Sequence, residues 1–170
     1  IEAAVDAVAD QDILTITADD FPLPSIHATL TKIKSDILHG RGFSLLRGLP
    51  VDEWSIDKTA RVYWGLGVHM GLPISQNAKG HALGHVKNLQ LGLSKSKTRG
   101  YERTDRLPFH TDTADIVGLF CRKPGKSGGD SLIVSSTSIY NEVARRRPDL
   151  AAVLMEPLQR SFVGKNRDDK

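Results

Sequence analysis

Apolar residues recur at helical spacing in two stretches near the start of the chain. Between Pro24 and His39 the repeat is carried by Ile26, Leu30, Ile33, Ile37 and Leu38. A stripe of this period marks the buried face of a helix, with Ser25 near its start and Gly40 as its stop. Ser55–Gly67 has a similar pattern, and Ser55 is a suitable N-cap. We therefore predict a helix over each stretch.

Four shorter apolar runs are too brief for helices and are bounded by glycine, proline or polar residues. They predict strands at Phe43–Leu46, Leu83–Leu89, Ile116–Cys121 and Gly128–Val134. After the last run, Thr137 or Ser138 is expected to cap a helix that continues to Arg147. A short helix then follows over Pro148–Met155. Helices packed on short strands indicate an α+β fold class.

The composition is typical of a globular chain with one core. The chain has 170 residues, of which 39% are hydrophobic, and this is enough for one domain. The polar, charged run over residues 161–170 predicts a flexible segment. No apolar run approaches the roughly 18 residues that span a bilayer, and no charged leader precedes an apolar stretch. The single cysteine, Cys121, excludes an internal disulfide and favours a reducing compartment, so we expect a cytoplasmic location.

The positive charge is concentrated in two places. The formal net charge is +3, and basic residues gather at Lys95–Arg103 and at Arg145–Arg147. A surface that binds nucleic acid needs aromatic side chains between its cations, but aromatic residues make up only 6% of the chain. The arginine triplet precedes Pro148, and cations are favourable at the end of a helix. We therefore expect solvated charged surface and disfavour nucleic acid as a partner, although the stretch before His110 is also placed to attract an anionic ligand.

The stretch with the clearest chemistry is Phe109-His110-Thr111-Asp112. If it is extended, His110 and Asp112 point to the same side, because side chains alternate along a strand. One imidazole nitrogen and one carboxylate oxygen then supply two ligands of a 2-His-1-carboxylate iron site. All six histidines lie at or before position 110, so no later residue supplies a second imidazole. The alternative is a surface turn, since a chain of this composition contains some His-x-Asp by chance about one time in four.

With its surroundings, this stretch resembles the taurine dioxygenase-like (clavaminate synthase-like) Fe(II)/2-oxoglutarate oxygenases. The resemblance rests on residues 109–112, the apolar strand after them, the turn Lys123–Asp130 and the passage from strand to helix over Ser131–Val143. A short strand that ends in Arg47-Gly48-Leu49 is similar to an early strand of the family. The likeness extends from about Gly40 to Leu154.

The resemblance implies a double-stranded β-helix, or jelly roll, with flanking helices. It implies that His110 and Asp112 are the first two iron ligands and that Ser131 supplies a hydroxyl to a carboxylate of 2-oxoglutarate. The second iron-binding histidine and the 2-oxoglutarate-binding arginine of the family come much later in the sequence. Neither position falls within this chain, which also starts without methionine. We therefore expect residues 1–160 to be the N-terminal part of a single oxygenase domain that continues after the segment 161–170.

The implied activity is oxidation of a C–H bond in a small molecule, by hydroxylation, desaturation or cyclisation. Fe(II) is the implied metal, and 2-oxoglutarate and O2 are the implied co-substrates, with succinate and CO2 as products. Two alternatives remain, namely a metal-free relative that keeps the fold and a basic binding module. The sequence leaves the substrate undetermined and the formation of a homo-oligomer open.

Four further residues are candidates for contact with the substrate. Ser75-Gln76-Asn77 corresponds to a loop that faces the substrate in the resembled family. Polar side chains of this kind orient small ligands in mostly apolar pockets. An equally good interpretation is a turn in which Asn77 bonds its own backbone. Arg106, four residues before His110, is placed to meet an acidic substrate.

Overall fold

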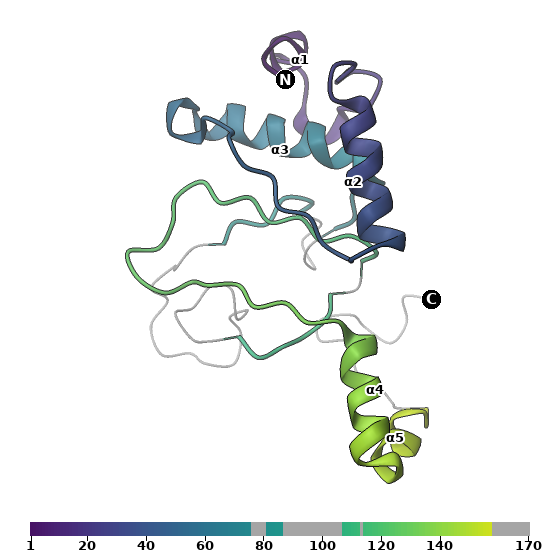
Figure 1. Cartoon of the computed structure of the whole chain (residues 1–170). Helices are drawn as coiled ribbons and strands as arrows, with labels where there is room; N and C mark the ends of the chain where they lie inside the picture. The colour runs from purple at the N-terminus through teal and green to yellow at the C-terminus, as the bar shows by residue number, and fades with distance from the viewer. Residues whose placement is uncertain (76–80, 87–106, 113, 158–170) are drawn as a thin grey trace, which may run out of the picture. The chain divides into compact units, whose positions relative to one another are not determined.

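The computed structural model describes residues 1–75, 81–86, 107–112 and 114–157 (Figure 1). The chain divides into two compact units between Arg122 and Lys123. The predicted flexible segment over residues 161–170 and the basic stretch Lys95–Arg103 lie outside the described residues. Of the helices in the described part, none is both long and apolar enough to cross a lipid bilayer.

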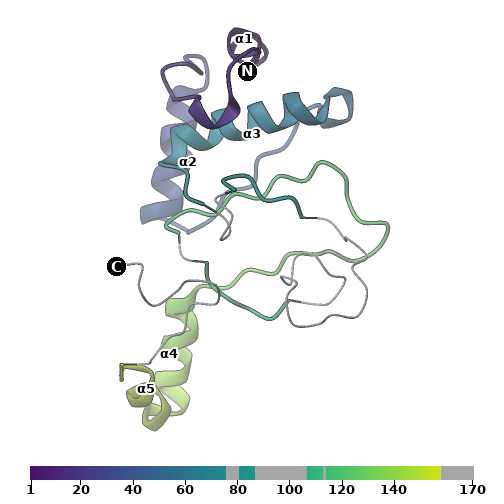
Figure 2. The same ribbon diagram turned by 180° about the vertical axis from the view of Figure 1, so that it is seen from behind.

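Helix α3 is the centre of the first unit. This unit contains α1 (Glu2–Ala7), the 3-10 helix η1 (Ile13–Thr15), α2 (His27–His39), the 3-10 helix η2 (Val51–Glu53) and α3 (Ile56–Met70). The elements α1, η1 and α2 each pack against α3, and Figures 1 and 2 show α3 crossing α2 with α1 beside them. The side chains of Val8, Phe21 and Val62 are fully buried between these elements.

The sequence explains how α3 begins and how it is held. The Ser55 hydroxyl accepts a hydrogen bond from the Lys58 amide at 3.1 Å, so Ser55 is the N-cap that the sequence predicts. Trp64, on the buried face of the helix, donates its indole N–H to the Ile16 carbonyl at 2.9 Å. This bond satisfies a donor that would otherwise be lost inside the core.

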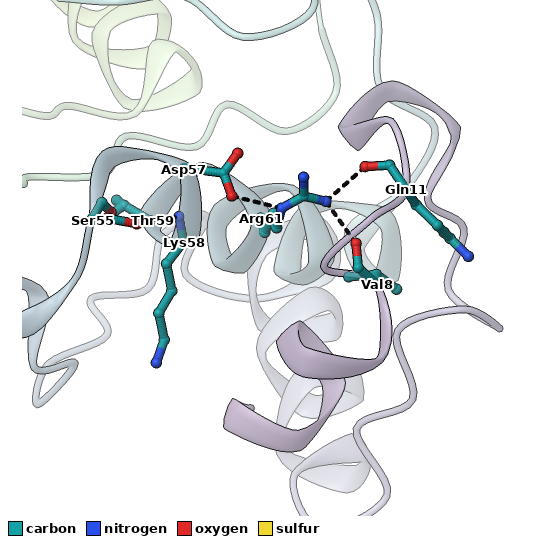
Figure 3. A network of polar contacts seen from close by, with 7 residues as sticks. All are labelled: Val8, Gln11, Ser55, Asp57, Lys58, Thr59 and Arg61. Atoms are coloured by element: carbon teal, nitrogen blue, oxygen red, sulfur yellow. Dashed lines mark hydrogen bonds and ion pairs between the residues drawn. The ribbon is translucent and has the colours of Figure 1, made fainter.

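A buried arginine joins α3 to the chain after α1 (Figure 3). Arg61 is only 9% exposed. Its Nε donates to Oδ2 of Asp57 at 2.8 Å, and its Nη1 donates to the carbonyl oxygens of Val8 and Gln11 at 2.7 and 2.8 Å. A helix leaves its last carbonyls without partners inside the helix. The guanidinium therefore supplies donors to backbone oxygens at and beyond the end of α1.

Gly65 lets the Phe21 ring lie directly on α3. A Cβ atom built at Gly65 would lie 2.4 Å from two atoms of that ring, which has no exposed surface. We expect Gly65→Ala to lower the free energy of unfolding by about 1–3 kcal/mol, because the ring must shift within a packed core. Equilibrium unfolding in urea measures this change.

Gly67→Ala is the matched control in the same helix. A Cβ built at Gly67 meets no atom of the described residues within 4 Å. Alanine is a better helix former than glycine by about 1 kcal/mol, so this substitution should stabilise the protein. The explanation for Gly65 is wrong if both substitutions shift the urea midpoint in the same direction.

The described part of the second unit is built on two short helices. The helices α4 (Ser136–Arg146) and α5 (Pro148–Leu154) pack against each other. The Ser135 hydroxyl caps α4 by accepting a hydrogen bond from the Ser138 amide at 3.2 Å. Pro148 stands at the first position of α5, where its missing N–H costs nothing.

The arginine triplet lies where α4 ends, as predicted. Arg145 and Arg146 form ion pairs with Glu142, and Arg147 pairs with Asp149. Hydrogen bonds from these arginines lower the pKa of the Glu142 and Asp149 carboxyl groups. Part of the positive charge of the triplet is therefore balanced within its own unit.

All four predicted helices are present, with shifted ends. The helix predicted from Pro24 begins at His27, and the helix predicted to end at Gly67 continues to Met70. The cap of α4 is Ser135, because four consecutive hydroxyl-bearing residues have similar capping chemistry and the sequence does not rank them. The sequence did not predict α1.

The prediction of four strands must be corrected, because no strand forms in the described residues. Residues 43–46, 83–86, 116–121 and 128–134 carry no strand, and residues 87–89 lie outside the described part. A strand requires a ladder of backbone hydrogen bonds to a neighbour, which these segments lack within the described part. Most of their apolar side chains are accordingly exposed, as Leu119 at 78% and Ile133 at 66% illustrate. The described residues therefore do not confirm the expected jelly roll.

Candidate functional site

The structure brings His110 and Asp112 together. Nε2 of His110 lies 4.0 Å from Oδ1 of Asp112, and the two side chains are 52% and 57% exposed. The side chains converge although residues 107–112 form no strand. Both side chains are about half exposed.

A backbone carbonyl determines which nitrogen of His110 carries the proton. Nδ1 lies 2.9 Å from the carbonyl oxygen of Pro108. Because a carbonyl only accepts hydrogen bonds, Nδ1 must be the donor. In the neutral ring the lone pair is then on Nε2, the nitrogen that faces Asp112. Metal-binding histidines are usually oriented in this way, with the second nitrogen donating to a carbonyl or a carboxylate.

The two donors fit an iron ion as part of its ligand set. Ligands about 2.1 Å from a metal at adjacent octahedral positions lie about 3 Å apart. The observed 4.0 Å is close enough for a rotation of the exposed Asp112 side chain to reach that spacing. Within the described residues, no third histidine, cysteine or carboxylate joins the pair. In an open iron site with three protein ligands, the pair would account for two of them.

Tyr63 holds the chain that follows the pair against α3. Its hydroxyl donates a hydrogen bond to the Gly118 carbonyl, and its ring packs edge-on against Phe120 with the ring centroids 5.6 Å apart. The helical pattern of Ser55–Gly67 does not single out Tyr63. Its hydrogen bond joins residues 55 positions apart, so no local pattern signals it.

Burial raises the pKa of the Tyr63 hydroxyl above its usual value of 10.0. The folded protein therefore holds this proton more tightly than the unfolded chain. The resulting stability is fully present below about pH 10 and falls as the pH rises beyond it. We expect Tyr63→Phe to remove this part of the loss of stability at alkaline pH. Urea unfolding on both sides of about pH 10 provides the check, and parallel curves for parent and variant would contradict the expectation.

Ser131 belongs to the second unit and follows a tight turn. It is exposed and precedes α4. The turn contains Gly128 and Gly129, whose φ angles of 71° and 81° both lie in the left-handed region. Residues with a Cβ adopt this region only with strain, so glycine suits both positions.

The predicted substrate contacts fall largely outside the described residues. Ser75 is exposed and lies after α3 in the first unit. Gln76, Asn77 and Arg106 are outside the described part. Their proposed contact with the substrate stays a prediction.

Known proteins are similar to this chain over most of its length. The sequence model of the family described as "Taurine catabolism dioxygenase TauD, TfdA family" matches residues 9–169. The chain is 31% identical over 130 residues to the FR-33289 synthase of Streptomyces rubellomurinus. This aligned stretch covers 76% of the chain and 38% of the synthase. The chain is 29% identical over 165 residues to the taurine hydroxylase-like protein SAT17 of Stachybotrys chartarum, with coverage of 92% and 43%. The chain thus spans about two fifths of the length of these relatives. No solved structure matches it significantly.

Proposed function

The chain belongs to the taurine catabolism dioxygenase TauD, TfdA family, and from this membership we propose that it contributes to a non-haem Fe(II)/2-oxoglutarate-dependent dioxygenase. The observation that carries the proposal is the pair His110 and Asp112. The bond to the Pro108 carbonyl leaves Nε2 of the neutral imidazole turned to the carboxylate with its lone pair free. A neutral imidazole and a carboxylate are the donor types of iron sites with open positions.

Each residue of the proposed site has a distinct role. His110 and Asp112 hold Fe(II), and the Pro108 carbonyl keeps the imidazole oriented by accepting from Nδ1. The Ser131 hydroxyl donates a hydrogen bond to a carboxylate of 2-oxoglutarate. Bound iron, with O2 and 2-oxoglutarate, supplies the oxidation of a C–H bond of a small molecule, which is hydroxylated, desaturated or cyclised while succinate and CO2 form. The proposed contacts to the substrate are Ser75, Gln76, Asn77 and Arg106.

We place residues 1–160 in the N-terminal part of a single oxygenase domain. Two observations support this placement. The match covers about two fifths of each relative. Within the described part, no third possible metal ligand joins His110 and Asp112. The rest of the domain would supply the third iron ligand and the arginine that binds 2-oxoglutarate. Its strands would also pair with exposed apolar segments such as residues 116–121 and 131–134, which would complete the jelly roll.

A metal-free binding protein is the second candidate. The observation that favours it is that, in the part of the chain that the structure describes, the pair has no third metal-binding neighbour. Such a protein would keep the family fold and bind a small molecule without oxidising it. A basic binding module would instead bind an acidic partner with a steep dependence on salt.

Anaerobic titration of the full-length protein with Fe(II) and 2-oxoglutarate tests the proposal. Chelation of iron by the keto acid gives a visible charge-transfer band, which reports the metal and the co-substrate together. Succinate is the matched control, because it has both carboxylates but lacks the keto oxygen needed for chelation. We expect a band with 2-oxoglutarate and none with succinate. A folded, full-length protein that gives no band would favour the metal-free binding protein.

Ser131→Ala is expected to weaken 2-oxoglutarate binding by about 1–3 kcal/mol, because a hydrogen bond to a charged group is lost. The concentration of 2-oxoglutarate at half of the maximal band measures the effect. Ser127→Ala, in the turn that precedes Ser131, is the control and should leave this concentration unchanged. An unchanged affinity in Ser131→Ala would remove Ser131 from the site.

A further inference from the structure

The contact between Tyr63 and Gly118 fixes a specific point of the chain after the iron-binding pair. The Tyr63 hydroxyl donates to the Gly118 carbonyl, and the Phe120 ring packs against the Tyr63 ring with the ring planes at 65°. A Cβ atom built at Gly118 would lie 2.9 Å from the hydroxyl oxygen. Glycine at position 118 therefore leaves the space that the hydroxyl occupies.

The segment of residues 118–122 is attached to the helical core on one side only. Phe120 packs on the hydrophobic core of the first unit, and Arg122 donates through Nη2 to the Trp54 carbonyl at 3.1 Å. The alternate residues Val117 and Leu119 are 53% and 78% exposed. Positions 118, 120 and 122 thus hold the segment, in the alternation expected of an extended chain.

In the part of the chain that the structure describes, the pair itself has only local support. Within the described residues, the polar contacts of His110 and Asp112 are to Pro108 and to each other. Their position on the molecule therefore depends on where the neighbouring chain is attached. In the described part, Gly118 is the first hydrogen-bonded attachment to the helical core after Asp112.

We propose that Tyr63 is a positioning residue for the iron-binding pair, an inference that rests on the proposed function. By holding the Gly118 carbonyl, the hydroxyl limits how far the segment slides along α3 and so determines where Asp112 presents its carboxylate. Metal sites require their ligands within about 0.5 Å of the productive geometry. Tyr63 acts through the backbone and does not touch the metal.

The test compares the Fe(II) affinity of three full-length proteins, namely the parent, Tyr63→Phe and Tyr140→Phe. The apparent dissociation constant of Fe(II) is read from the chelate band at saturating 2-oxoglutarate without O2. We expect Tyr63→Phe to weaken Fe(II) binding about tenfold, as contacts outside the ligand shell commonly do. Tyr140 is exposed on α4 and provides the matched loss of a hydroxyl, so Tyr140→Phe should bind Fe(II) as the parent does.

Substitution of Gly118 breaks the same contact from the other side. We expect Gly118→Ala to weaken Fe(II) binding at least as much as Tyr63→Phe, because its Cβ displaces the hydroxyl. The double variant Tyr63→Phe/Gly118→Ala should bind no more weakly than Gly118→Ala, since both changes remove one shared contact. Effects that add in full would mean that the two residues act separately and would overturn the inference.

Urea unfolding of the same proteins separates positioning from stability. An unchanged Fe(II) affinity in Tyr63→Phe overturns the inference, whatever happens to the urea midpoint. A parent without a band overturns the proposed function, and the inference falls with it. If the parent gives a band and Tyr63→Phe gives an equal band at every Fe(II) concentration, the inference is overturned but the proposed function stands.

Discussion

His110→Ala is expected to abolish turnover in the full-length protein and to remove the band formed by Fe(II) and 2-oxoglutarate. The substitution deletes the nitrogen that the Pro108 bond leaves free for a metal. Loss of a partner outside the ligand shell already weakens metal binding about 10- to 100-fold, so loss of a ligand should exceed a hundredfold. Asp112→Ala should have the same effect, because it removes the carboxylate that faces this nitrogen.

The matched control is an exposed histidine of the first unit that lies away from the pair in the sequence. His39 stands in the last turn of α2 and is exposed. His39→Ala should retain both the band and turnover. If His110→Ala retained the band at the parental Fe(II) concentration, the pair would not be the metal site.

Arg61→Ala should lower the free energy of unfolding by about 3 kcal/mol. The variant leaves the Val8 and Gln11 carbonyls without their charged donor. Hydrogen bonds to charged groups contribute about 1.5–3 kcal/mol each. This loss is a large fraction of the about 5–15 kcal/mol that stabilises an ordinary domain. Urea unfolding of the full-length protein measures it.

Two further variants show which bonds of Arg61 matter. Asp57 is 64% exposed, so its ion pair with Arg61 contributes little, and Asp57→Asn should cost less than about 1 kcal/mol. Arg61→Lys keeps the charge, but an ammonium group cannot donate to Asp57 and to both carbonyls as the planar guanidinium does. The free energy of unfolding of Arg61→Lys should therefore lie between those of the parent and of Arg61→Ala. An Asp57→Asn variant as unstable as Arg61→Ala would locate the stabilisation in the ion pair instead.

The helices were predictable because their signals are local. Ser55 caps α3 and Gly40 ends α2, and both are read from residues within one turn of the helix end. The start of α4 was predicted two or three residues late, since Ser135 to Ser138 all offer a hydroxyl. Helix α1 has no side-chain cap and only six residues, which left little pattern to find.

The strands and the supporting contacts of the site depend on distant residues. A strand exists only when another segment pairs with it, and the sequence of one segment does not contain its partner. Convergence of His110 and Asp112 followed from their spacing, whereas the Pro108 carbonyl that orients the imidazole has no sequence signal, because every residue carries one. The same holds for Tyr63, whose role depends on a residue 55 positions away.

Within the described residues, three side chains of α3 donate hydrogen bonds to backbone carbonyls of other segments of the first unit. Arg61 reaches Val8 and Gln11, Trp64 reaches Ile16, and Tyr63 reaches Gly118. These bonds place no demand on the side chain of the accepting residue, except at Gly118, where the hydroxyl occupies the space of a Cβ. These bonds therefore put no other constraint on the sequence of the accepting segments, although packing in the core still constrains Val8 and Ile16. Correlated substitutions between homologues would not reveal these contacts, and changes at an exposed acceptor such as Gln11 should be silent.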